Sequence, residues 1–152
     1  MTGRPDLNLG NFLPYLINRA GAAMVAQFTA QALDRHRLSI AMWRVLLVLA
    51  NAGEQRQVGL VGLTSIDAST LSRIVTRLVR MGLVTRARSQ TSNREVVVQL
   101  SAKGAALVES VIPIARELER RAGAGLPAKD MAMVKRSLRR IYQNIVDGRP
   151  AV

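Results

Sequence analysis

Arginine and hydroxyl side chains recur from Ile66 to Val84 at a spacing that fits one face of a helix. If a helix begins after Asp67, its polar face carries Ser69, Thr70, Ser72, Arg73, Thr76 and Arg77. Short hydroxyl side chains let a helix approach the major groove of DNA closely, and arginine can reach guanine edges or flanking phosphates. The segment therefore predicts a helix that reads double-stranded DNA. The alternative is an ordinary amphipathic surface helix whose charges are solvated.

The residues that follow continue this basic character. Between Asp67 and Glu95 the chain has no acidic residue and six arginines, at positions 73, 77, 80, 86, 88 and 94. The polar run from Ser89 to Asn93 has the composition of a hairpin tip that could carry Arg94 into a narrow, electronegative minor groove. We therefore also expect DNA contacts from Arg86, Arg88, Ser89, Gln90, Asn93 and Arg94. A solvent-exposed turn is the alternative interpretation of the tip.

The composition of the chain favours a polyanionic partner. Its 152 residues include 22 Lys and Arg against 10 Asp and Glu, which leaves a net charge of +12. Nucleic acid is the first candidate for so basic a protein. Non-specific nucleic-acid binding, as in an architectural protein, would produce the same charge and stays open as an alternative function.

Residue types suited to catalysis or metal binding are scarce. The chain has no Cys and a single His, His36, so we expect neither a thiol-based redox sensor nor a transition-metal site. It has no Gly-rich phosphate loop and no clustered carboxylate pair, so we expect no enzyme activity and no cofactor. A signal pattern is missing at the N-terminus, and no apolar stretch approaches the ~20 residues that span a bilayer. These features predict a cytoplasmic protein without a membrane partner.

Helices on both sides must position the DNA-reading segment. A first helix is expected from Asn11 to about Asp34, on the stripe Leu13, Ile17, Ala20, Met24 and Phe28. Ser39 can cap a second helix that runs to about Asn51, with an inward face of Trp43, Leu46, Leu47 and Ala50. A short helix over 58–65 contains Gly59 and Gly62 and therefore needs tertiary support. The DNA-reading helix is expected to stop at Gly82.

Beyond Gly82 the hydrophobic period changes from that of a helix to that of a strand. Residues 83–88 and 95–100 are expected to pair as a hairpin. Ser101 can cap a following helix, which Pro113 should bend and Gly123 should end. Pro127 opens a last helix with the apolar positions Met131, Val134, Leu138, Ile141 and Ile145. Helix interfaces between two copies show this spacing, and so do helices packed within their own chain.

Three stretches, together with the element order, resemble the MarR family of winged helix-turn-helix regulators over nearly the whole chain. They are STLSRIVTRLVRMGLVTRARS from Ser69 to Ser89, NREVVVQLSAKG from Asn93 to Gly104, and LSIAMWRVLLVLANAG from Leu38 to Gly53. Two positions depart from the usual pattern: Ser92 stands where the family has Asp, and Leu60-Val61 where it has Leu-Ala.

The resemblance implies a mainly α fold with a small β-hairpin wing, in which a winged helix-turn-helix is joined to a helical dimerisation domain. Residues 1–152 would form one MarR-like domain. Within it, 38–100 would be the DNA-binding lobe, and 8–36 with 101–147 the dimerisation region. A homodimer would place two recognition helices on a palindromic operator with half-sites about 10 bp apart.

The resemblance also implies a sequence-specific transcriptional regulator, expected to be a repressor released by an aromatic acid, a phenolic or an acyl-CoA. By position, the effector pocket would be lined by Tyr15, Asn18, Arg19, Met42 and Trp43. Arg19 could instead form an intersubunit salt bridge or remain solvated. Trp43, the only Trp, could be a core residue.

Overall fold

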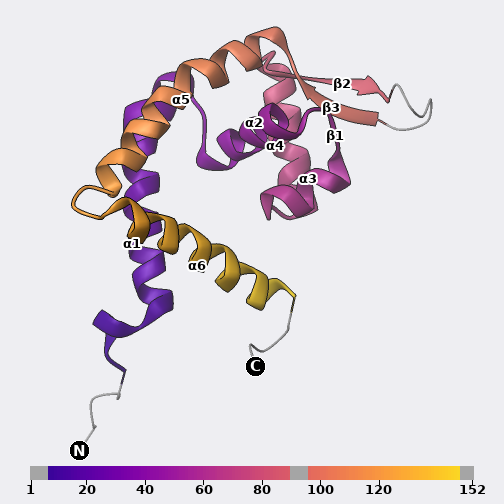
Figure 1. Ribbon diagram of the computed structural model, residues 1–152. Helices are drawn as coiled ribbons and strands as arrows, with labels where there is room; N and C mark the ends of the chain where they lie inside the picture. The colour runs from indigo at the N-terminus through magenta and orange to yellow at the C-terminus, as the bar shows by residue number, and fades with distance from the viewer. Residues whose placement is uncertain (1–6, 90–95, 148–152) are drawn as a thin grey trace, which may run out of the picture. The chain divides into compact units, whose positions relative to one another are not determined.

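The computed structural model describes residues 7–89 and 96–147, which form helices and one small antiparallel sheet (Figure 1). The chain separates into two compact units, the first ending at Leu118 and the second beginning at Glu119. The fold is mainly α, as expected, and the sheet belongs to the first unit.

The first long helix, α1 (Leu13–Phe28), begins with Pro14 in its first turn, where a missing N–H costs nothing. It continues as a π-turn over Thr29–Leu33 and a short 3-10 turn over Asp34–His36, so the helix predicted from 11 to about 34 is confirmed. Of the predicted apolar stripe only Phe28 is buried, and its ring meets that of Trp43 edge to face, with centroids 5.5 Å apart. Most of α1 therefore contributes little to the core of its own chain.

Helix α2 (Ile40–Ala52) lies at the centre of the first unit. The Ser39 hydroxyl accepts a hydrogen bond from the Met42 N–H at 3.2 Å, which confirms the predicted cap. Trp43 and Leu46 are buried as expected, but the expectation for Ala50 is wrong, because it is exposed. The additional buried positions are Met42, Val45 and Leu49. They lie on the side of α2 that contacts α3, α4 and the sheet, whereas Ala50 lies in the last turn of the helix.

The short helix α3 (Gln57–Thr64) has the tertiary support that its two glycines require. Leu60 is buried in the core, and the Thr64 hydroxyl donates to the Leu60 carbonyl at 2.5 Å. From α2, the Arg44 guanidinium donates to the Thr64 carbonyl at 3.2 Å. This bond satisfies one of the carbonyls that a helix leaves open at its C-terminus. The chain then bends by 110° into α4 (Ala68–Arg80), within the range of helix-turn-helix motifs.

The sheet of the first unit has three strands. Strands β2 (Val84–Arg88) and β3 (Val96–Leu100) pair antiparallel from Val84 opposite Leu100 to Arg88 opposite Val96, which confirms the hairpin. A third strand, β1 (Gln55–Arg56), joins the other edge of β3. Sequence patterning missed β1 because two residues are too few to show a period. The predicted tip residues Gln90, Asn93 and Arg94 lie outside the described residues.

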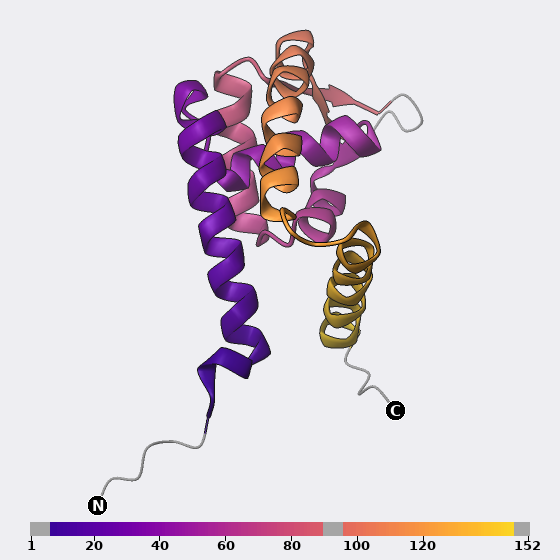
Figure 2. The same cartoon turned by 60° about the vertical axis from the view of Figure 1, so that its left-hand side comes forward.

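Helix α5 (Ala102–Ala122) closes the core of the first unit with Val108 and Val111. It continues through Pro113 as a single element and ends before Gly123, as predicted; the expected bend stays a prediction. Within the first unit α5 runs alongside α1 (Figure 2). Ala115 and Leu118 of α5 line a cavity together with Met24 and Val25 of α1.

The second unit contains the last turn of α5 and helix α6 (Ala128–Val146), which begins directly after Pro127 as predicted. A salt bridge joins Glu119 to Lys135 within this unit. No residue of α6 is buried, although its sequence has a continuous apolar stripe. Among the described residues no single helix is long and apolar enough to cross a bilayer; only the bent pair α3 and α4 passes when joined.

Candidate nucleic-acid interface

The N-terminus of α4 is held by Asp67. Its carboxylate accepts hydrogen bonds from the Thr70 N–H at 2.9 Å and from the Ser69 hydroxyl at 2.8 Å. The hydrogen bond from Thr70 has the larger effect and the one from Ser69 the smaller. Together they hold the pKa of the Asp67 carboxyl well below its ordinary value, because they stabilise the charged form. The predicted cap is therefore confirmed. Because the Ser69 proton is engaged with Asp67, the Ser69 oxygen can offer a DNA base only an acceptor.

Helix α4 has one buried face and one accessible face. Leu71, Ile74, Val75 and Leu78 are buried in the core. On the other side Arg73 and Arg77 are exposed one turn apart, and Ser72 and Thr76 are half-buried between them and the core. Two guanidinium groups at this spacing, flanked by short hydroxyl side chains, form a surface that can enter a major groove and donate to bases or phosphates.

The hairpin is linked directly to this helix. From strand β2, the Arg86 guanidinium donates a hydrogen bond to the Thr76 hydroxyl of α4 at 3.1 Å. Two residues that the sequence predicts as separate DNA contacts are thus partners of one another. Arg86 keeps further donors, because a guanidinium has five N–H groups, so it can hold α4 and reach a phosphate at the same time.

Two predicted DNA contacts lie at the base of the hairpin, and one is exposed whereas the other is buried. Arg88 at the end of β2 is exposed. Ser89, the next residue, is only 6% exposed. The Ser89 hydroxyl is therefore less accessible to a nucleic acid than the Arg88 guanidinium, and a DNA contact by Ser89 stays a prediction.

The C-terminus of α4 is held by a glycine turn. Gly82 has a φ of 71°, its N–H donates to the Val79 carbonyl at 2.9 Å, and the Leu83 N–H donates to the Leu78 carbonyl at 3.0 Å. This pair of bonds is the Schellman motif, which needs a left-handed residue and therefore favours glycine. The predicted helix stop at Gly82 is confirmed.

The start of α5 is fastened to the same turn. The Ser101 hydroxyl donates to the Gly82 carbonyl at 2.6 Å and accepts from the Gly104 N–H at 3.0 Å. The Lys103 ammonium donates to the Met81 carbonyl at 3.0 Å. A Cβ on Gly104 would lie 1.9 Å from the Leu83 carbonyl oxygen, so only glycine allows this approach. Sequence reasoning predicted Ser101 as a cap but missed the role of Gly104 and Lys103, whose contacts are 20 or so residues away in the chain.

An apolar cavity of about 230 Å³ lies in the first unit, between α1, α2 and α5. Its lining residues are Met24, Val25, Phe28, Ile40, Trp43, Ala115 and Leu118. Of the predicted effector-pocket residues only Trp43 is among them. Met42 is 2% exposed and belongs to the core instead, because it is adjacent to Trp43 in α2 and adjacent residues of a helix point about 100° apart.

The other three predicted pocket residues lie nearer the beginning of α1. The Arg19 guanidinium sits 5.7 Å from the centre of the Tyr15 ring, a cation–π contact, and Asn18 is exposed beside them. These polar groups do not line the cavity. The sequence did not predict that α5 lines the cavity, because residues more than 70 positions apart show no common period.

Apolar side chains are also exposed on two helices. On α1 these include Leu13, Leu16 and Ile17, and on α6 Val134, Leu138 and Ile145, of which Ile145 is 75% exposed. Large apolar side chains in rows on one helix face indicate a surface that another polypeptide covers.

Comparison with known proteins gives concordant results. Residues 38–96 match the family model described as MarR family. The transcriptional repressor NicR of Pseudomonas putida is 31% identical over 130 residues, which cover 86% of this chain and 82% of NicR. Among solved structures, Bordetella bronchiseptica BpsR, whose DNA binding is regulated by 6-hydroxynicotinic acid, superimposes with a TM-score of 0.79 at 27% identity, covering 90% of this chain and 96% of BpsR. An E. coli MarR variant in complex with operator DNA superimposes with a TM-score of 0.75 at 25% identity, covering 85% and 92%.

Proposed function

The chain belongs to the MarR family, and from this premise we propose that it is a sequence-specific transcriptional repressor that binds double-stranded operator DNA. The observation that carries the proposal is the accessible face of α4, on which Arg73 and Arg77 are exposed beside Thr76, the partner of Arg86. Non-specific nucleic-acid binding would need only charge. A helix capped at both ends and linked to a hairpin also provides the fixed geometry that base reading requires.

In this proposal α4 enters the major groove and the hairpin follows the adjacent backbone. Arg73 and Arg77 reach bases or phosphates, assisted by Ser69, Thr70, Ser72 and Thr76. Arg86 and Arg88 contact phosphates beside the groove. Gln90, Asn93 and Arg94 would reach the minor groove from the hairpin tip. We assign the DNA-binding lobe to residues 38–100 of a single domain.

The functional form is proposed to be a homodimer on a palindromic site. Its interface would use 8–36 and 101–147, which include the exposed apolar rows of α1 and α6. Two-fold symmetry would present two α4 helices to successive major grooves, about 10 bp apart.

The effector is proposed to be a small aromatic acid. The cavity beside Trp43 is apolar, and about 230 Å³ suits one ring better than an acyl-CoA. BpsR, a structural neighbour, is regulated by 6-hydroxynicotinic acid, a ligand of this class. Arg19, with Tyr15 and Asn18, lies outside the cavity of its own copy and would offer a cation and polar groups to a carboxylate bound across the dimer.

The proposed role as a repressor also bears on where the protein acts and on whether it catalyses a reaction. A repressor must act where the chromosome is, so we propose a cytoplasmic protein. The relatives named above are regulators, and we propose no catalytic activity for this chain.

Selection from a pool of random duplexes tests the proposal. We expect enrichment of one palindromic sequence by the wild-type protein and weaker enrichment by Arg73→Ala, which removes donors from the accessible face of α4. Arg37→Asn removes an equal charge from the exposed turn before α2, where Asn tolerates the left-handed backbone, and serves as the control. Equal recovery of all sequences by the wild type would instead support the architectural alternative.

A further inference from the structure

Ser69 lies at the centre of the accessible face of α4. At 3.6 residues per turn it points about 180° away from Leu78 and about 160° away from Leu71, and both of these leucines are buried in the core. Ser69 itself is exposed, in the first turn of the helix. In helix-turn-helix proteins the N-terminal residues of the recognition helix contact base edges. Ser69 is therefore placed to meet a base rather than only the flanking phosphates.

The hydroxyl of Ser69 has a fixed hydrogen-bonding polarity. A free serine hydroxyl can either donate to a base or accept from one. Here the hydroxyl donates its proton to the Asp67 carboxylate, with 2.8 Å between the two oxygens. Hydrogen bonds from Thr70 and then from Ser69 hold the pKa of Asp67 well below its ordinary value, so the carboxylate stays ionised and has no proton to give back. The Ser69 oxygen is left as an acceptor.

The hydroxyl of Thr76 has the opposite arrangement. Thr76 follows Ser69 by two turns on the same side of α4. Its oxygen accepts a hydrogen bond from the Arg86 guanidinium at 3.1 Å, and this bond leaves the hydroxyl proton to be donated elsewhere. The two hydroxyls on one side of the helix therefore differ in what they can offer to DNA.

We propose that Ser69 determines specificity at one base pair of each half-site by accepting a hydrogen bond from an exocyclic amino group, that of adenine or of cytosine. In the major groove these amino groups are the donors, whereas thymine presents O4 and guanine presents O6 and N7 as acceptors. An acceptor placed against O4 or O6 would leave both oxygens without a donor, which disfavours binding. The inference rests on the proposed function, because it requires that α4 enters the major groove.

The first test removes the amino group from the DNA without adding bulk. In the operator obtained by selection, purine replaces adenine, or 2-pyrimidinone replaces cytosine, at each position in turn. For the wild type we expect one position per half-site at which this replacement weakens binding about fivefold, the value of one hydrogen bond. Ser69→Ala should show no such loss at that position. Replacement by 7-deazapurines, which lack the N7 acceptor, should affect the wild type and Ser69→Ala alike.

The second test frees the Ser69 proton. Asp67→Gly removes the acceptor of that proton at little cost to the cap, whereas Asp67→Asn removes the same charge and keeps an oxygen that can accept the proton. The sensitive base pair is inverted, so that thymine O4 or guanine O6 takes the place of the amino group. Inversion should weaken binding by the wild type and by Asp67→Asn about fivefold or more. Asp67→Gly should lose less, because its Ser69 can donate to the new oxygen.

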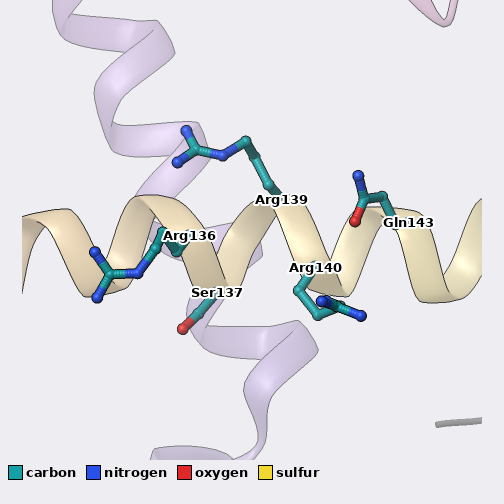
Figure 3. Close-up of a pocket in the computed structure, with 5 residues that line it drawn as sticks. All are labelled: Arg136, Ser137, Arg139, Arg140 and Gln143. Carbon is teal, nitrogen blue, oxygen red and sulfur yellow. The ribbon is translucent and has the colours of Figure 1, made fainter.

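A charge control is available in the second unit. Arg139 extends outward from α6 (Figure 3) and is exposed. Arg139→Gln lowers the net charge and leaves the hydroxyls of α4 unchanged, so removal of the amino group should weaken its binding as much as that of the wild type. If Arg139→Gln abolished this loss as Ser69→Ala does, the inference would be overturned, because charge alone would account for the effect.

The outcomes separate this inference from the proposed function. If the wild type selects no sequence, the proposed function fails and the inference fails with it. Two other results overturn the inference alone, in a protein that does select an operator. In one, Ser69→Ala leaves every effect of amino-group removal unchanged, or removes the sensitivity to 7-deazapurines instead. In the other, inversion of the base pair weakens binding equally in Asp67→Gly and Asp67→Asn.

Discussion

The Arg86 guanidinium and the Thr76 hydroxyl are joined by a hydrogen bond of 3.1 Å that connects the hairpin to the DNA-reading helix. Because the bond crosses from β2 to α4, the two elements proposed to contact DNA keep a defined relation before DNA is present. Arg86 therefore has a positioning role in addition to any phosphate contact.

Thr76→Val and Arg86→Ala should each weaken operator binding, and their effects should not add. A hydrogen bond to a charged group is worth about 1.5–3 kcal/mol, and solvent reduces that value for this exposed pair, so we expect a coupling energy of about 1 kcal/mol in a double-mutant cycle. Operator affinity of the wild type, both single variants and the double variant measures it. Thr76→Ser keeps the hydroxyl and should behave like the wild type. Strict additivity would show that the two residues act separately.

Arg73→Ala and Arg94→Ala should both weaken operator binding, but in different ways. Loss of a base contact by Arg73 should reduce discrimination at one position of the site by about 1–3 kcal/mol. Loss of Arg94 from the tip should reduce affinity for all sequences alike. A panel of operators with single base-pair changes distinguishes these patterns. Wild-type affinity in both variants would contradict the assigned DNA-binding surface.

Gly104→Ala should destabilise the protein. Its Cβ would lie 1.9 Å from the Leu83 carbonyl oxygen, so the start of α5 must move away from the turn that ends α4. Overpacking of this kind costs about 1–3 kcal/mol, measurable by urea unfolding. Gly62→Ala is the matched control, because a Cβ there meets nothing within 4 Å, and it should stabilise α3 by about 0.5–1 kcal/mol. Equal effects of the two substitutions would contradict the close approach at Gly104.

Asp67 should make the thermal stability depend on pH in acid. Hydrogen bonds from Thr70 and Ser69 lower its pKa in the folded state, so its stabilising contribution is present above the pKa of the unfolded chain. The contribution is lost as the pH falls through the lower, folded pKa. Asp67→Asn keeps a capping side chain without the charge. We expect the difference in Tm between wild type and Asp67→Asn to narrow as the pH falls below about 4. A constant difference down to pH 2 would rule out this role.

Ala115→Phe should abolish the response to effector while DNA binding persists. Ala115 lines the cavity beside Trp43, and a phenyl ring there would occupy the space proposed for the ligand. Trp43 is the only Trp, so its fluorescence reports binding of aromatic acids directly. Ala106→Leu adds apolar volume at an exposed position of the same helix and should respond like the wild type. If Ala115→Phe still releases operator DNA with effector, the ligand site is elsewhere.

The limits of each helix follow from local chemistry, and so they could be predicted from the sequence. Ser39 and Asp67 cap helices with their own side chains, and Gly82 supplies a left-handed turn. Each of these signals acts over three or four residues, within reach of one side chain. The same short range made the polar face of α4 visible as a pattern of arginines and hydroxyls.

The tertiary structure alone decided how distant segments meet. It paired β1 with β3, enclosed Ser89, joined Arg86 to Thr76 and brought Ala115 opposite Trp43. These relations depend on which surfaces come together when the core forms. Hydrophobic burial is non-directional, so the pattern of one element does not say which other element covers it. Sequence periodicity therefore determined the long helices and the hairpin and which side of each is polar. Three-dimensional packing determined which polar groups became partners of one another and which stayed free for DNA.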